Sequence, residues 1–177
     1  MPDDYPDTVN MASGIAVTFE PQLRVAKISG KQEDDILYVP THWHEYHDEI
    51  IAVREGKLKV TLGSEVKICT PETGDVFIPR GVPHSLESFK GVSCVFTEST
   101  NPKDFDTKEV FFRNLLAMPG GLSASLLPAM QVYYYGDIYP VFPIHFSWLE
   151  KAFVIVLGGY LAPLLGYRVR YGTLKKA

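Results

Sequence analysis

The chain contains little cysteine and no excess of positive charge. Its 177 residues include two cysteines, Cys69 and Cys94, and each lies in an apolar, strand-like segment. Two thiols without close spacing do not make a disulfide framework, so we expect buried free cysteines and a cytoplasmic location. The formal net charge is −4, which excludes the basic footprint of a nucleic-acid-binding protein.

Long apolar runs are also missing. The N-terminal stretch MPDDYPDTVN is acidic and lacks the apolar block of a secretion signal, so residues 1–12 are predicted to be a flexible tail. The longest uncharged helical piece, in 152–167, is shorter than the ~20 residues of a membrane span. It is predicted to be a buried or interfacial helix. Membrane contact through residues 142–167 stays as an alternative, because four basic residues follow: Arg168, Arg170, Lys175 and Lys176.

Residues 13–100 read as an all-β unit. Short runs rich in Val, Ile, Phe and Thr alternate with turn residues at close spacing. Such short links force neighbouring strands to pair antiparallel. The expected strands are Gly14–Phe19, Leu23–Ile28, Ile36–Val39, Glu49–Arg54, Lys57–Leu62, Val66–Thr70, Val76–Pro79, His84–Glu87 and Val92–Glu98.

The pattern changes in residues 101–177. Apolar positions 111, 112, 115 and 116 have helical spacing, and the segment 114–167 carries three charged residues, Asp137, Glu150 and Lys151. So few charges indicate that most of the segment is covered. We predict a helical, aromatic-rich extension that packs on the barrel or at a homodimer interface.

Histidines and carboxylates are concentrated just before an apolar strand, in PTHWHEYHDEII. His42 and His44 are two residues apart and therefore project to the same face of a strand. Glu49 lies an odd number of positions beyond His44, so the intervening residues must form a turn or bulge for its carboxylate to reach the same side. His84, after a proline-bounded turn, is placed to return to this site. Three imidazoles and one carboxylate suit a divalent transition metal.

These residues resemble the two signatures of the cupin superfamily. His42-x-His44-x4-Glu49-x6-Gly56 matches the first, and Gly74…Pro79-x-Gly81-x2-His84 resembles the second. The second signature departs in one turn length and in having Ser88 where the family usually has asparagine. The resemblance implies a double-stranded antiparallel β-helix, the jelly-roll barrel, with His42, His44, Glu49 and His84 as metal ligands. The aromatic tail is similar to that of small fungal cupins from natural-product gene clusters.

Several questions stay open at this level. The metal is iron, zinc, manganese, nickel or cobalt, since the ligand types accept each of them. Glu45 and His47 are the candidate catalytic residues, although His47 is interpreted foremost as a solvated loop residue. His145 is interpreted as a packing histidine.

The favoured function is a metal-dependent enzyme of secondary metabolism acting on a small, apolar, oxygen-bearing substrate such as a polyketide-like or aromatic intermediate. It would act by oxygenation or oxidation, or by Lewis-acid isomerisation, dehydration, cyclisation or decarboxylation. The alternatives are a non-catalytic ligand-binding module and a membrane-associated accessory protein.

Overall fold

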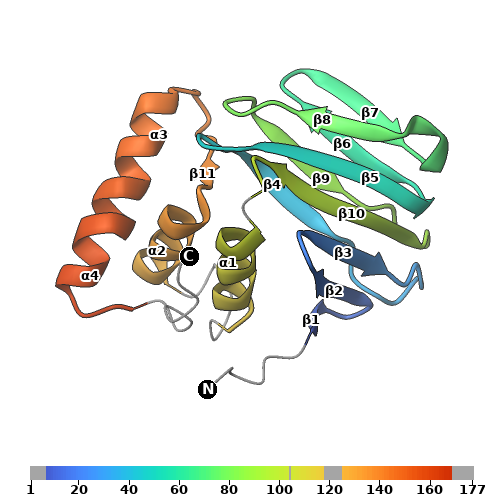
Figure 1. Cartoon of the computed structure of the whole chain (residues 1–177), viewed down its shortest axis with the longest axis horizontal. Coiled ribbons are helices and arrows are strands. Elements are labelled where there is room, and N and C mark those ends of the chain that lie inside the picture. Colours follow the sequence, from blue (N-terminus) through green and yellow to red (C-terminus); the bar gives the residue numbers. More distant parts are fainter. Residues whose placement is uncertain (1–6, 104, 118–124, 169–177) are drawn as a thin grey trace.

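The computed structural model describes residues 7–103, 105–117 and 125–168, which form two antiparallel sheets and a layer of helices beside them (Figure 1). The first sheet has the order β1 (Thr8–Ala12), β2 (Ile15–Glu20), β3 (Leu23–Ile28), β10 (Cys94–Asn101), β5 (Asp48–Gly56), β8 (Asp75–Ile78). The second has the order β11 (Tyr139–Pro140), β4 (Tyr38–Trp43), β9 (His84–Glu87), β6 (Leu58–Leu62), β7 (Glu65–Cys69). The predicted antiparallel jelly-roll barrel with a C-terminal helical extension is confirmed.

The inner faces of the two sheets form the main core. Alternate residues of each strand point inward, as in β2, where Ile15, Val17 and Phe19 are buried. They meet Leu58 and Val60 of the opposite sheet in one apolar cluster. Both cysteines are buried and free, as predicted.

The prediction of a flexible tail is wrong for residues 8–12. This segment forms β1 and pairs antiparallel with β2. Val9 and Met11 alternate with polar residues and pack against the core, which explains why the segment is ordered. Residues 1–6 lie outside the described part of the chain.

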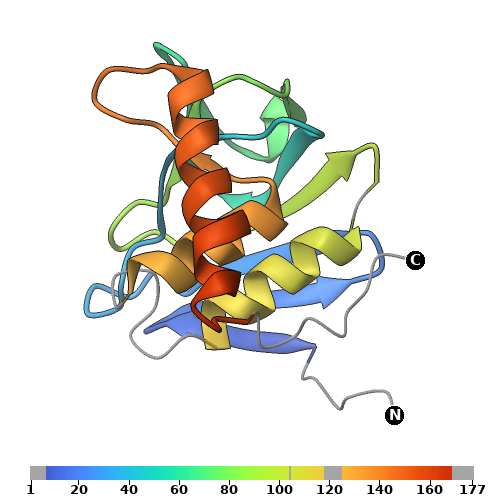
Figure 2. The ribbon, with the colours of Figure 1, turned by 90° about the vertical axis from the view of Figure 1, so that its left-hand side faces the viewer.

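The extension forms α1 (Phe105–Ala117), α2 (Leu126–Gly136) and one long helix over Ser147–Leu164. The long helix comprises α3 (Ser147–Val154), a π-helical stretch (Ile155–Leu161) and α4 (Ala162–Leu164). Figure 2 looks onto this long helix, which lies on the outside of the helical layer. A Cβ at Gly158 would lie 2.0 Å from the carbonyl oxygen of Met130, so glycine permits the close approach to α2.

The prediction that the extension is covered holds for only part of it. The long helix buries Glu150, Val154, Gly158 and Ala162, but its outer face is exposed and apolar. Trp148 is 69% exposed and Leu164 is 82% exposed. By length and composition the helix Ser147–Leu164 is able to cross a membrane, and 22% of it is buried inside the protein.

Polar contacts attach the extension to the last residue of β4 and to the segment between β4 and β5. The Trp43 indole donates to Glu150 at 2.8 Å, and Lys151 pairs with Glu45 at 2.5 Å. Asp137 accepts hydrogen bonds from the backbone N–H groups of residues 45 and 46 at 3.1 and 2.9 Å. The three charged residues of the otherwise uncharged segment 114–167 therefore all contact the end of β4 or the loop that follows it.

Candidate metal centre

Strand β4 directs two histidines into the barrel and the residue between them outward. His42 lies in β4 and His44 directly follows it, and both are buried. Trp43 points to the opposite side, where it stacks on Tyr139 at 4.5 Å between ring centroids and joins the core of the helical layer. The two histidines therefore face the site, and the tryptophan between them packs against the extension.

The turn after His44 brings the Glu49 side chain to the same side as the two histidines, as the sequence predicted. Asp48 begins β5 and is bound by the guanidinium and the backbone N–H of Arg80, with Nε to Oδ1 at 3.0 Å. The hydrogen bonds from Arg80 lower the pKa of Asp48 to about 2. Arg80 holds the Asp48 side chain on its own side of the strand. Successive side chains of a strand alternate, so the next residue, Glu49, points inward.

The structure brings the four predicted ligands together. The ligand atoms of His42, His44, Glu49 and His84 all lie within 4.8 Å of one another. Glu49 Oε2 is 3.0 Å from His44 Nε2 and 3.3 Å from His84 Nε2. None of the four residues is more than 8% exposed.

All three imidazoles are oriented by a backbone carbonyl. Nδ1 of His42 lies 2.8 Å from the carbonyl oxygen of Pro40, and Nδ1 of His84 lies 2.9 Å from that of Val82. Nδ1 of His44 lies 2.7 Å from the carbonyl oxygen of Asp137, which comes from the extension. A carbonyl only accepts, so each Nδ1 carries a proton and each Nε2 faces the centre, as in metal-binding histidines.

This arrangement fits a cation. Burial lowers the pKa of His44 to about 3 and that of His42 well below its ordinary value, so both rings are neutral. Burial raises the pKa of Glu49, but its imidazole contacts outweigh that effect and the carboxyl stays ionised. Glu49 Oε2 approaches Nε2 of His44 and of His84 to 3.0 and 3.3 Å, so a proton or a metal ion must lie between these atoms.

His47 is not the solvated loop residue that we predicted. It is 3% exposed, its ring centroid lies 4.2 Å from that of His44, and Nδ1 donates to Asp137 at 2.8 Å. Asp137 adopts the left-handed conformation at the end of α2, with φ of 54°, which turns its carboxylate toward this loop. Ligand atoms of His44, His47 and Asp137 also lie within 4.8 Å of one another, and these hydrogen bonds account for that group.

Two further predicted residues lie away from the cluster. Glu45 is half-buried and pairs with Lys151. His145 is exposed and contacts Glu150 at 3.0 Å, so it is not a packing residue in the core. Glu45 and His47 are both absent from the wall of the pocket described next, so a catalytic role for either one stays a prediction.

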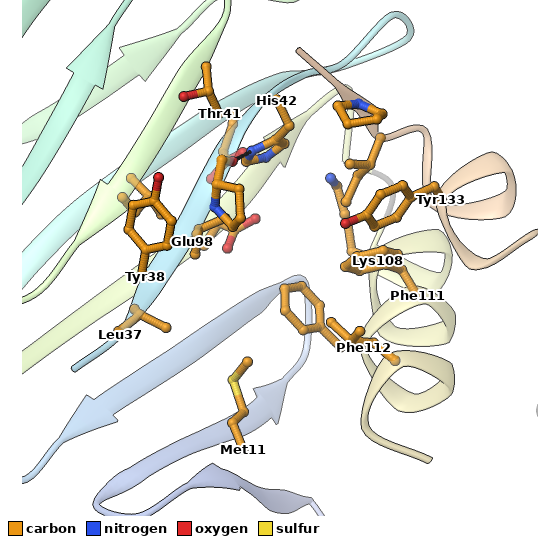
Figure 3. A pocket seen from close by; sticks show the side chains of 17 residues that line it. Met11, Leu37, Tyr38, Thr41, His42, Glu98, Lys108, Phe111, Phe112 and Tyr133 are labelled. Atoms are coloured by element: carbon orange, nitrogen blue, oxygen red, sulfur yellow. Dashed lines mark hydrogen bonds between the residues drawn. The ribbon is translucent and has the colours of Figure 1, made fainter. Parts of the chain in front are cut away.

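The cluster opens into a pocket of about 240 Å³ between the barrel and the helices (Figure 3). His42 and Glu49 belong to both the cluster and the pocket wall. Apolar side chains from strands and helices supply most of the wall, among them Met11, Leu37, Val39, Leu86, Phe111 and Phe112. An apolar cavity with few polar groups is typical of small-molecule sites.

Sequence reasoning missed Lys108, a buried residue of the pocket wall. It precedes Phe111, Phe112 and Leu115 at helical spacing, so it lies on the apolar stripe of α1. A lysine on such a stripe is the signal that would have found it, because lysine is rarely buried without a partner.

Comparisons with known proteins agree with this architecture. Residues 37–97 match the family model described as "Cupin domain". An oxidoreductase of Arthrobotrys oligospora is 29% identical over 146 residues, covering 73% of this chain and 56% of the relative. The probable oxidoreductase patJ of Penicillium expansum is 24% identical over 143 residues, covering 73% and 43%. The chain thus spans about half the length of the curated relatives it matches.

Solved structures align with part of the chain. The polyketide cyclase RemF from Streptomyces resistomycificus aligns with a TM-score of 0.40 and 23% identity, over 51% of this chain and 67% of that one. A sugar phosphate isomerase of the cupin superfamily from Silicibacter pomeroyi aligns with a TM-score of 0.42 and 15% identity, over 55% and 71%. Both signatures lie within residues 37–97, so this part of the chain matches a cupin domain.

Proposed function

We propose that this chain forms a metal-dependent enzyme centre that acts on a small, largely apolar molecule bearing an oxygen group, such as an aromatic or polyketide-like intermediate of secondary metabolism. One observation carries the proposal: His42 and Glu49 are shared between the four-residue cluster and the wall of an apolar pocket. A substrate in this pocket therefore touches the residues that would hold the ion.

The ligand set leaves room for chemistry. His42, His44, Glu49 and His84 would hold the ion, and four protein ligands leave one or two positions open on an ion of five or six coordination. An iron ion would supply redox chemistry with dioxygen, whereas zinc or manganese would supply Lewis-acid catalysis. The curated relatives are named oxidoreductases, which favours the first branch. The protein's own part is to orient three imidazoles and to keep water from an apolar substrate.

Elemental analysis combined with turnover tests this proposal. We expect about one transition metal per purified chain, and iron if the redox branch is correct. The iron-loaded protein should consume dioxygen with hydroxylated naphthalenes, measured with an oxygen electrode, and the chelator-treated protein should not. Equal rates with and without metal would contradict the proposal. Binding of such compounds without any turnover would instead support a non-catalytic binding module.

A second candidate is a membrane-associated role, and the outer face of the long helix favours it. Trp148, Val156, Tyr160 and Leu164 are all exposed, whereas Glu150 on the same helix is fully buried. Eighteen residues span about 27 Å, and aromatic residues near helix ends are typical of membrane interfaces. Since Gly158 fixes the helix against α2, we propose that it lies on the membrane surface and does not leave the protein.

Vesicle flotation tests this surface. We expect the protein to float with vesicles of phosphatidylcholine and phosphatidylserine, and the fluorescence of Trp148 to shift to shorter wavelength. Tyr160→Glu and Leu164→Glu together should abolish flotation, whereas Val66→Glu, at another exposed apolar residue, on β7, should not. Absence of flotation together with a homodimer in gel filtration that Leu164→Glu dissociates would assign the face to a second copy of the chain.

A further inference from the structure

Strand β10 places a carboxylate on the inner face of the barrel. Glu98 lies two residues beyond the buried Phe96 and therefore projects to the same side of the strand. It belongs to the wall of the pocket, and Figure 3 shows it on the strand side, opposite the helix that carries Phe111 and Phe112. Charged side chains are almost never buried unless they are paired, so this carboxylate needs a fixed partner.

Arg24 supplies that partner from the neighbouring strand. It lies directly opposite Glu98 in the pairing of β10 with β3, and its guanidinium forms an ion pair with Oε1 of Glu98. The ring of Phe112 covers the guanidinium at 4.2 Å. Burial lowers the pKa of Arg24 to about 9, so it is still protonated at neutral pH and keeps Glu98 ionised. Among the described residues, Glu98 lines the main pocket and Arg24 does not, so the arginine holds the carboxylate from outside this pocket.

A smaller hollow adjoins the pocket at Glu98. It has a volume of about 40 Å³ and shares six wall residues with the main pocket: Met11, Leu37, Val39, Leu86, Glu98 and Phe112. Arg24 also lines it. A cavity needs about 10–15 Å³ to hold one water molecule, so the hollow takes a hydroxyl group beside a ring in the main pocket. An ionised carboxylate only accepts hydrogen bonds, so a group that binds Glu98 must donate one.

The register of the first sheet sets the distance from Glu98 to the metal cluster. Glu98 pairs with Ile51 of β5, and Glu49 lies two residues before Ile51 on the same inner face. Glu98 is therefore a diagonal neighbour of Glu49, and such neighbours lie roughly 7–8 Å apart. One small molecule of one or two fused rings is able to place an oxygen at the cluster and a hydroxyl at Glu98.

We propose that Glu98 accepts a hydrogen bond from a hydroxyl group of the substrate while another oxygen of the same molecule faces the metal cluster. The inference rests on the proposed function and narrows its substrate class to aromatic or polyketide-like molecules with a free hydroxyl in addition to the oxygen at the metal. A molecule without this hydroxyl leaves the carboxylate without its donor, which lowers affinity. Glu98 is then a specificity-determining residue of the barrel.

Two probes test the proposal by calorimetric titration of zinc-loaded protein. 2,7-Dihydroxynaphthalene carries two hydroxyl groups, and 2-naphthol has the same rings with one. We expect the unmodified protein to bind the diol at least about tenfold more tightly than 2-naphthol. Glu98→Gln should weaken binding of the diol about fivefold or more and that of 2-naphthol less than about twofold, because a neutral amide is a weaker acceptor than a carboxylate.

A double variant and a control complete the test. Arg24→Leu combined with Glu98→Leu removes both charges together, so no buried charge is left unpaired and the barrel should fold. It should bind the two probes with affinities within about threefold of each other. Glu87→Gln is the matched control, because Glu87 pairs with Lys59 at a position about one-third exposed and outside the described pocket wall. This variant should keep both affinities.

The outcomes separate this inference from the proposed function. Metal content is measured on every variant, since Glu98 is not a predicted ligand and its replacement should leave the metal bound. Equal affinity for the two probes in the unmodified protein would overturn the inference, and so would Glu98→Gln if it changes both affinities equally or neither. A preference for the diol that depends on Glu98 in protein that binds no metal would support the inference and contradict the proposed function. If Glu98→Gln does not fold, the double variant decides by losing or keeping the preference.

Discussion

We expect Glu49→Gln to abolish metal binding at the proposed centre while the barrel stays folded. The substitution keeps the size of the side chain but removes the one carboxylate that faces the Nε2 atoms of His44 and His84. A cation in this site would lose its anionic ligand. Replacing a residue that only hydrogen-bonds to a metal ligand typically costs 10–100-fold in metal affinity, so we expect the loss of the ligand itself to cost about a hundredfold or more. Metal per chain, measured after gel filtration, should drop from about one to below about one tenth.

The same substitution should also affect the metal-free protein. Burial raises the pKa of Glu49, but its contacts with His44 and His84 lower it further, so the folded state favours the ionised carboxylate and Glu49→Gln should lower the midpoint of thermal unfolding at neutral pH. Glu45→Gln is the matched control, because Glu45 lies in the same segment but pairs with Lys151 outside the pocket. Metal retained by Glu49→Gln, or lost equally by Glu45→Gln, would contradict the proposed ligand set.

The sequence was sufficient to predict that His42, His44 and Glu49 cluster, because the governing signals are local. Strand alternation places His42 and His44 on one face, and the odd spacing to Glu49 required the bend that the structure contains. His84 needed the family resemblance as well, since only the pairing of β4 with β9 places it opposite His42. Most predicted strands agree with the structure to within two residues for the same reason.

Contacts between distant segments account for what the sequence did not predict. His47 looks solvated among Glu45 and Asp48, and it is buried because Asp137 reaches it from 90 positions further along the chain. No spacing rule links His47 to Asp137, so only a three-dimensional arrangement reveals this contact. Residues 8–12 differ, because their partner is the next strand, β2; the acidic residues and prolines that precede them made the segment look like a tail.

Glu150 should be the main residue that holds the extension against β4, the strand that carries His42 and Trp43. This fully buried carboxylate accepts hydrogen bonds from the Trp43 indole and the Phe142 backbone at 2.8 Å each, and it contacts His145 at 3.0 Å. Burial raises the pKa of Glu150, but these donors outweigh it and lower the pKa below its ordinary value. Glu150→Ala leaves buried donors unpaired, which costs about 3–5 kcal/mol. For a chain of this length, thermal unfolding should begin roughly 6–20 °C lower.

Lys151→Ala is the control for Glu150→Ala. Lys151 is the next residue along the helix and also pairs with the loop, through Glu45, but both side chains are about one-third exposed. A partly exposed ion pair is worth less than about 1 kcal/mol, so this variant should unfold within a few degrees of the unmodified protein. Trp43 lies between His42 and His44, so Glu150→Ala should also weaken metal binding about tenfold. Equal destabilisation by the two variants would show that general packing, and not the buried carboxylate, holds the extension against β4.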